Sequence, residues 1–207
     1  MRIQWSDPPK PAQPADVPAD WHTVNGPTAS KAFKLAALVG MVLLVILCIA
    51  LGNWAAYASE KGRMAIASDM VYPWLAPAIV LIMFIPLHEL IHLLGHPGWG
   101  LTDNSILTIW LAKLRFGVYY EGRMSRRRWL AMRLAPFIML CLLPALIVAC
   151  MQTGPSNPDV QVGLVVMMMV NALGSGGDLI AVALVLRQVP ASAVLHFRDG
   201  HAYWQSS

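Results

Sequence analysis

Three ionisable side chains in an apolar stretch have the types and the spacing that could hold and use a metal ion. The run FIPLHELIHLLGH, residues 84–96, contains His88, Glu89 and His92 in an HExxH pattern. On a helix, residues four apart in sequence lie about 40° apart around the axis, so both imidazoles can reach one ion from the same face. The carboxylate of Glu89 is then close enough to take a proton from a water molecule that the ion activates. The pattern therefore predicts zinc-assisted hydrolysis of a peptide bond, with zinc as the cofactor.

The alternative to a metal site is a cluster of histidines held by hydrogen bonds alone. The chain has only 6 histidines among 207 residues, and chance produces an HExxH pattern in on the order of a few such chains per thousand. A charged side chain at the centre of a bilayer costs roughly 2.5 to 3.5 kcal/mol, so such a group requires a partner. Both considerations favour metal binding by His88 and His92.

A catalytic zinc ion usually has three protein ligands, and the sequence offers two candidates for the third. His96 continues the spacing of the first two histidines, but the sequence GHPGWG around it predicts that the helix ends there. Asp178 is the only acidic residue of the apolar segment at 160–186, and its expected depth below the nearer membrane face agrees with that of the HExxH pattern. The small residues GSGG before it would let two helix backbones approach closely. We therefore favour Asp178 over His96.

The composition is that of a membrane protein rather than a soluble one. Hydrophobic residues make up 57% of the chain and charged residues 13%, against roughly 25% charged residues in typical globular proteins. Four segments are apolar enough to cross a hydrocarbon core of about 30 Å, which takes roughly 20 helical residues. They are residues 35–57, 72–94, 129–151 and 160–186. The predicted fold class is therefore an all-α membrane protein, a four-span bundle of transmembrane helices.

Three regions are expected along the chain. Residues 1–30 hold six of the 15 prolines and are predicted to form a Pro-rich disordered arm. Residues 31–187 form the predicted four-helix transmembrane metalloprotease-like domain, and residues 188–207 form a cytosolic tail. Within residues 105–120, alternating polarity and β-branched and aromatic side chains predict a short cytosolic β-ribbon between the second and third spans, with an interfacial amphipathic helix as the alternative.

The distribution of Lys and Arg predicts how the chain crosses the membrane. Twelve basic residues lie in the arm, the loop between the second and third spans, and the tail, whereas two lie on the opposite side. The positive-inside rule then puts both termini in the cytosol, and we expect an integral multi-pass protein of the bacterial inner membrane. Arg133, inside the third span, is expected to snorkel to the same interface. Because the basic residues gather beside apolar segments, membrane lipids are the expected partners and nucleic acid is not.

The motifs resemble those of a known family. HELIH on one span, a later N…GSGGD on another, and a Pro-containing span between them, RLAPF at 133–137, resemble the putative zincin peptidases. These are small membrane proteins related to the site-2 protease group of intramembrane metalloproteases. The resemblance covers roughly residues 72–187, and it implies a zinc metalloprotease that cleaves a peptide or a transmembrane protein. It further implies that His88, His92 and Asp178 bind zinc and that Glu89 activates water.

Two hypotheses about use of the site remain open. The first is proteolysis, in which the β-ribbon at 105–120 offers an edge strand that holds an extended substrate. The second is a non-proteolytic metal-binding membrane protein or a transporter that uses the same ligands. A transporter typically has ionisable groups at several depths, whereas the ionisable groups here gather at one depth, which favours a site over a pathway.

Overall fold

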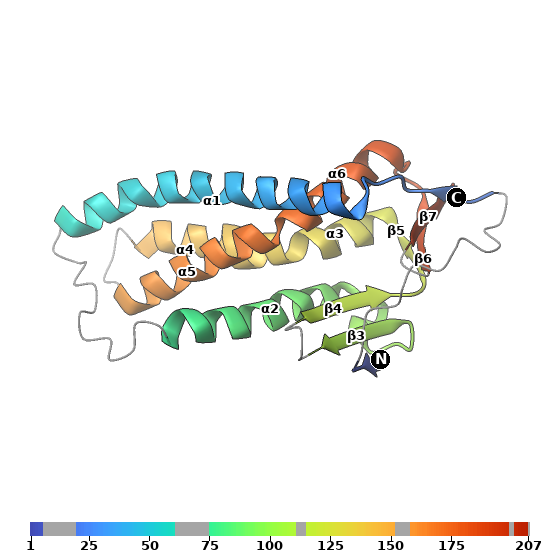
Figure 1. Cartoon of the computed structure of the whole chain (residues 1–207), viewed down its shortest axis with the longest axis horizontal. Coiled ribbons are helices and arrows are strands. Elements are labelled where there is room, and N and C mark those ends of the chain that lie inside the picture. Colours follow the sequence, from blue (N-terminus) through green and yellow to red (C-terminus); the bar gives the residue numbers. More distant parts are fainter. Residues whose placement is uncertain (6–19, 61–74, 111–114, 152–157, 199–200, 207) are drawn as a thin grey trace. The chain divides into compact units, whose positions relative to one another are not determined.

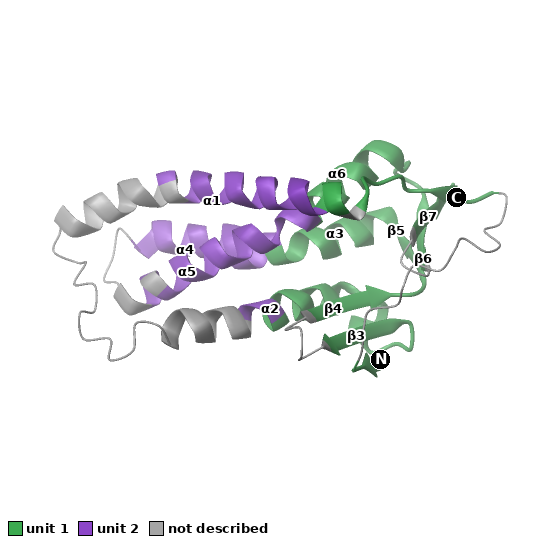
Figure 2. Ribbon diagram, in the orientation of Figure 1, with its two compact units in different colours: residues 1–32, 86–136, 178–207 green, residues 33–85, 137–177 purple. Residues whose placement is uncertain are grey.

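The computed structural model describes residues 1–5, 20–60, 75–110, 115–151, 158–198 and 201–206. The chain divides into two compact units, which Figure 2 distinguishes by colour. Unit 1 consists of Met1–Ala32, Pro86–Pro136 and Asp178–Ser207, and unit 2 consists of Phe33–Ile85 and Phe137–Gly177. Every residue predicted to act in the site, namely His88, Glu89, His92 and Asp178, belongs to unit 1.

Unit 2 is built from apolar helices (Figure 1). Most of α1 (Ala29–Glu60) belongs to it, together with the π-helical turn η3 (Ile138–Leu142), α4 (Leu143–Met151) and α5 (Pro158–Gly174). A Cβ atom on Gly40 of α1 would lie 2.7 Å from the carbonyl oxygen of Leu173, so α1 and α5 approach closely at this glycine. Large apolar side chains of α1 face outward, as expected of a lipid-facing helix. They include Leu38, Met41, Val45, Ile46 and Ile49.

The predicted all-α four-span bundle is wrong. Among the described residues, two helical stretches are long and apolar enough to cross a membrane, Ser30–Leu47 and Arg126–Met151. Gly163–Gly174 and Gly176–Gln188 add a third if the pair counts as one span, although the two helices meet at a bend of 51°. The same described residues also form seven strands in two sheets. Apolar length alone cannot show that a segment is bent, and it carries no information about short strands.

The first sheet confirms the predicted β-ribbon. Strands β3 (Ser105–Trp110) and β4 (Arg115–Tyr120) are antiparallel, with Ser105 opposite Tyr120. Strand β1 (Arg2–Gln4) lies parallel to β3, so the order is β1-β3-β4 and β4 is an edge strand. The Arg2 guanidinium also binds the Glu121 carboxylate at 2.7 Å. Among the described residues, the ribbon therefore has the edge strand that the sequence analysis expected.

The second sheet joins both ends of the chain to its middle. Its order is β2 (His22–Thr23), β7 (His201–Gln205), β6 (Val194–Arg198) and β5 (Arg123–Ser125), and all pairings are antiparallel. It packs with α3 (Arg126–Phe137) and α6 (Gly176–Gln188) around the core of unit 1. The buried core residues are Tyr120, Met124, Trp129, Met132, Val182, Val185, Val189, Ala193 and Leu195.

Helix α2 (Leu75–Gly95) ends where the sequence predicts. It is followed by the short 3-10 helix η1 (Pro97–Gly100), in which Gly100 has φ +78. A Cβ atom on Gly100 would lie 2.6 Å from the carbonyl oxygen of Leu93, so this position requires glycine. The turn directs the chain from α2 into β3, and it thereby places the β-ribbon directly after the helix that carries the HExxH pattern.

Candidate metal centre

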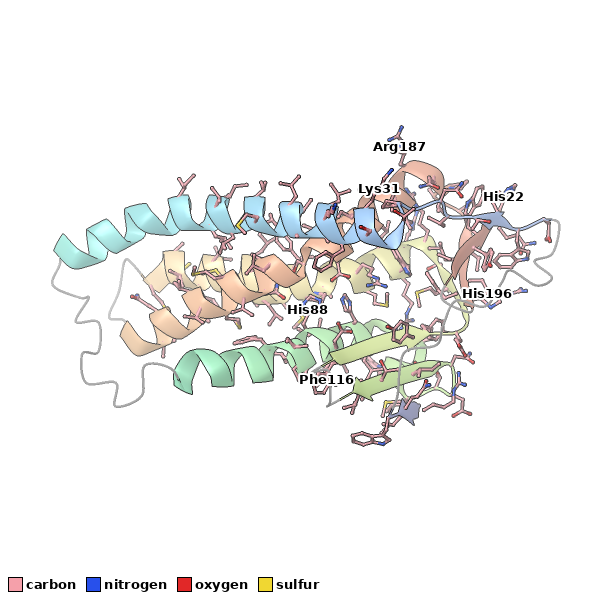
Figure 3. The ribbon with its side chains drawn as sticks, viewed as in Figure 1. His22, Lys31, His88, Phe116, Arg187 and His196 are labelled. Carbon is pink, nitrogen blue, oxygen red and sulfur yellow. The ribbon has the colours of Figure 1, made fainter. Side chains whose placement is uncertain are left out.

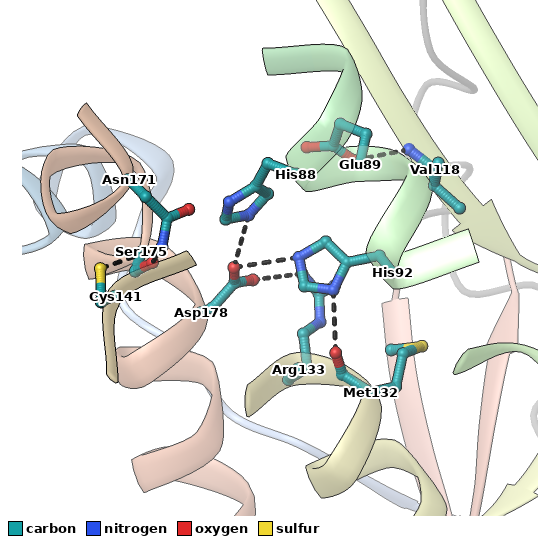
Figure 4. A network of polar contacts seen from close by, with 10 residues as sticks. All are labelled: His88, Glu89, His92, Val118, Met132, Arg133, Cys141, Asn171, Ser175 and Asp178. Carbon is teal, nitrogen blue, oxygen red and sulfur yellow. Dashed lines mark hydrogen bonds and ion pairs between the residues drawn. The ribbon is translucent and has the colours of Figure 1, made fainter. Parts of the chain in front are cut away.

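Two histidines of α2 and one aspartate of α6 lie together inside unit 1 (Figure 4). The Nε2 atoms of His88 and His92 each lie 3.0 Å from Oδ2 of Asp178. Each of the three residues offers one ligand atom, and these three atoms lie within 4.8 Å of one another. The side chains of His92 and Asp178 are only 5% and 8% exposed, so the group is shielded from solvent. The structure therefore brings together the three residues that the sequence predicts as metal ligands.

The spacing of α2 explains how its two histidines meet. His88 and His92 are one helical turn apart, and their ring centroids are 4.8 Å apart with the planes at 79°. His88 projects from α2 in Figure 3. The Nδ1 atom of His92 lies 3.0 Å from the backbone carbonyl oxygen of Met132 in α3, which fixes the orientation of the ring.

A break in the last apolar segment places Asp178. Helix α5 ends at Gly174 and α6 begins at Gly176, so Asp178 lies in the first turn of a new helix. The N-terminus of a helix carries a partial positive charge, which stabilises a carboxylate there. A Cβ atom on Gly176 would collide with the carbonyl oxygen of Ala36, so this glycine permits close contact with α1. The GSGG sequence thus supplies both the bend and a tight helix packing site.

Asn171, which belongs to the same sequence motif, lies in unit 2 and stabilises the region of the break. Its side-chain nitrogen donates to Oγ of Ser175 at 3.2 Å and to Sγ of Cys141 at 3.1 Å (Figure 4). The backbone N–H of Ser175 also donates to the carbonyl oxygen of Asn171. These buried contacts hold the last turn of α5 together where the regular helix ends.

Sequence reasoning missed the role of Arg133. The Nη1 atom of this α3 residue donates to Oδ1 of Asp178 at 2.7 Å, a partner that the expected snorkelling to the membrane interface did not include. The two carboxylate oxygens therefore have separate partners, Arg133 for Oδ1 and the two histidines for Oδ2. The signal in the sequence was that Arg133 is the only charged residue of the apolar segment at 129–151, where a charge requires a partner.

The hydrogen bonds of His92 test whether the group fits a metal ion. A carbonyl oxygen only accepts, so the contact with Met132 puts the proton of neutral His92 on Nδ1. The lone pair of Nε2 then faces a carboxylate oxygen at 3.0 Å, an arrangement that needs a second proton or a cation between the two atoms. Two imidazole nitrogens and one carboxylate oxygen form a known type of ligand set for catalytic zinc, which leaves one position open. The residues present therefore fit a zinc ion.

Glu89 lies beside this group and contacts the β-ribbon. Its Oε2 atom accepts a hydrogen bond from the backbone N–H of Val118 at 3.0 Å. Val118 lies in β4, and this N–H points away from β3, toward the free edge of the sheet. The sequence predicted the role of Glu89 and the presence of the β-ribbon separately, but nothing in it indicated that Glu89 contacts the ribbon.

His96 does not join the candidate ligands. Its Nδ1 atom lies 3.1 Å from Oγ of Ser105, and its carbonyl oxygen accepts a hydrogen bond from Arg128 at 2.7 Å. Burial, followed by nearby positive charges of which that of Arg133 is the largest, lowers the pKa of His96 to about 4. The ring is therefore neutral at neutral pH and ties the end of α2 to the start of β3.

Comparison with known proteins identifies a family. Residues 81–194 match the sequence profile of the family described as Putative zincin peptidase. The match covers more than half of the chain and includes His88, Glu89, His92 and Asp178. No curated protein and no solved structure matches the chain.

Proposed function

The chain belongs to the Putative zincin peptidase family, so its activity is broadly metallopeptidase-type hydrolysis, and we propose that His88, His92 and Asp178 hold its zinc ion. We propose further that Glu89 is the general base. One observation carries this assignment: both Nε2 atoms converge on Oδ2 of Asp178 at 3.0 Å, while Arg133 occupies the other carboxylate oxygen.

The proposed reaction divides the chemistry between the ion and the protein. Zinc supplies Lewis-acid chemistry, which polarises a peptide carbonyl and lowers the pKa of water. Glu89 takes a proton from the attacking water molecule as the oxygen of that water bonds to the carbonyl carbon of the peptide. It then gives that proton to the amide nitrogen as the C–N bond breaks. Met132 and Arg133 orient His92 and Asp178 through these hydrogen bonds.

The membrane setting is part of the proposal. The apolar candidate spans support membrane association, and we propose that cleavage occurs at or within the bilayer, as in the site-2 protease group. The asymmetry of Lys and Arg supports a multi-pass protein of the bacterial inner membrane with both termini in the cytosol. The substrate would then be a peptide or a membrane protein, with lipids as the surroundings.

A non-proteolytic metal protein or a transporter is the competing function. An ion that moves through a transporter meets ligands along its path. In the part of the chain that the structure describes, one group of three metal-ligating side chains is found. This favours a fixed site over a pathway.

Metal removal tests the proposed function directly. We expect the purified full-length protein in detergent to carry about one zinc ion per chain and to hydrolyse an unfolded polypeptide such as casein. A chelator should stop hydrolysis, and added zinc should restore it. His88→Ala should lose zinc, whereas His22→Ala, at an exposed position of β2, should keep it. Hydrolysis at the wild-type rate after complete removal of zinc would contradict the proposal.

A proline in β4 tests whether the edge strand holds the substrate. The N–H groups of Phe116 and Val118 face the same side of β4, because residues two apart in a strand point the same way. Phe116 lies on the ribbon in Figure 3. Phe116→Pro removes one outward N–H without removing a bond to β3, and proline is tolerated in such edge positions. We expect cleavage to slow about tenfold at unchanged zinc content, because one substrate hydrogen bond is lost.

Phe116→Ala is the matched control, because it removes the same side chain but keeps the backbone N–H. The prediction fails if the proline variant processes a substrate as fast as the alanine variant. A proline at Leu114 was the other natural choice, but that position lies outside the described residues.

A further inference from the structure

A cavity of about 310 Å³ lies beside the candidate metal centre within unit 1. Its lining includes His92, one of the three candidate ligands, and Arg133, which pairs with another. Val118–Glu121, at the end of β4, form part of its wall, and residues of α3, α6 and β6 contribute to the rest. Most of the lining is apolar. Its large side chains include Tyr120, Met124, Trp129, Met132, Val185 and Phe197.

The size of the cavity restricts what can enter. Ligand pockets in proteins span roughly 300 to 1,000 Å³, so this cavity lies at the lower end of the range. An α-helix with its side chains is about 10 to 12 Å across, and an intact substrate helix is therefore too large. One aromatic or long aliphatic side chain, attached to a backbone that remains outside, suits the volume.

The lining also restricts the chemistry of the occupant. An apolar wall stabilises an apolar group and penalises a polar group that finds no hydrogen bond. The cationic side chain in the lining is that of Arg133, which lies at the end of the cavity nearest the candidate metal centre. It donates to Asp178 but remains 34% exposed. An occupant with an apolar end in the cavity and a peptide group near Arg133 satisfies both environments.

We propose that this cavity is a substrate side-chain subsite, which receives one aromatic or long aliphatic side chain of an extended peptide lying along β4. The inference rests on the proposed peptidase function. Side chains of an extended peptide alternate between two faces, so a peptide paired with the edge of β4 can direct one side chain into the cavity while the adjacent peptide group lies near His92. The subsite thus selects substrates that have a large apolar residue next to the scissile bond.

Helix α6 offers a matched pair of variants. Ala181 lies one turn after Asp178 and lines the cavity, so Ala181→Phe fills the space from a position outside the candidate ligand set. Ala183 is exposed on the same helix, and Ala183→Phe adds the same group outside the cavity. Leu184 also lines the cavity, and Leu184→Ala enlarges it.

Peptide binding to the full-length protein in detergent tests the subsite without relying on catalysis. The probes are fluorescent peptides, blocked at both ends, that differ only by Phe or Ala at one central position, and they are titrated into zinc-loaded and zinc-free protein with empty micelles subtracted. We expect the Phe peptide to bind about 10- to 100-fold more tightly than the Ala peptide. Ala181→Phe should remove this preference, and Ala183→Phe should keep it. Leu184→Ala should shift the preference toward a Trp peptide.

Several results would overturn the subsite. They are equal binding of both peptides to the wild type and a Phe preference that survives Ala181→Phe. Displacement of both peptides alike by a fatty acid would identify a lipid cavity instead. If Ala181→Phe does not fold, an unchanged Phe-to-Trp ratio in Leu184→Ala overturns the proposal. Selective binding without zinc-dependent hydrolysis would refute the proposed function alone, whereas hydrolysis without side-chain preference would refute the subsite alone.

Discussion

Glu89→Gln is expected to abolish peptide hydrolysis and to leave zinc binding intact. Glutamine has nearly the same shape as glutamate, and its amide oxygen can still accept the hydrogen bond from Val118. It cannot take a proton from water at neutral pH, and general acid–base catalysis contributes about 10²- to 10⁴-fold to such reactions. The cleavage rate should therefore fall by at least about 100-fold while the zinc content per chain stays at the wild-type value.

Two companion measurements make the Glu89 result decisive. Glu89→Asp keeps a carboxylate on a side chain one methylene shorter, and we expect it to retain intermediate activity. Loss of zinc from Glu89→Gln would assign Glu89 to the ligands and argue against its role as a base. Unchanged hydrolysis in Glu89→Gln would instead favour a different base, and a protein with full zinc content and no hydrolysis in any variant would favour the transporter or scaffold hypothesis.

Asp178→Ala is expected to remove the zinc ion and to destabilise the metal-free protein as well. The substitution deletes one of three candidate ligands, and it leaves the Arg133 guanidinium without the carboxylate at 2.7 Å. Removal of one partner from a buried ion pair typically costs about 3 to 5 kcal/mol, and the partial exposure of Arg133 reduces this to about 2 to 3 kcal/mol. Zinc affinity should fall by more than about 100-fold. This exceeds the loss of affinity expected when a residue that only hydrogen-bonds a metal ligand is removed.

A second substitution separates the two effects of Asp178→Ala. Arg133→Met in the same chain removes the unpaired charge, so the double variant should regain most of the lost thermal stability but not the zinc. Asp103→Ala is the control, because Asp103 has a fully exposed side chain that contacts the N-terminal amino group at 3.6 Å. Metal analysis and thermal unfolding of chelator-treated protein measure both quantities. Wild-type zinc affinity in Asp178→Ala would refute the assignment of Asp178.

The residues of the candidate centre were accessible to sequence reasoning because each carries a local signal. His88 and His92 show the i, i+4 spacing of one helical face, and Asp178 is an isolated acid in an apolar segment. The structure brings these three side chains together. The β-ribbon was predictable for the same reason, because alternating polarity is a property of a few consecutive residues.

The remaining structure depends on partners that are distant in the sequence. Strand β1 has three residues and pairs with a strand about a hundred positions away, Arg2 opposite Ile106, and β2 has two residues, with His22 opposite Trp204. Segments this short show no periodicity, so only tertiary pairing defines them. The bend between α5 and α6 was missed because glycine and serine next to apolar residues fit both a continuous span and a broken one.

The hydrogen bond between Val118 and Glu89 has a consequence for the order of events in the proposed peptidase. One N–H group donates fully to one acceptor at a time, and a substrate strand that pairs with β4 requires the N–H of Val118. The carboxylate and the substrate therefore compete for the same donor. On the proposed mechanism, the ribbon engages the base in the resting protein, and an extended polypeptide that pairs with β4 would release it. Binding of substrate would then free the group that activates water, whereas the idle enzyme would keep it occupied.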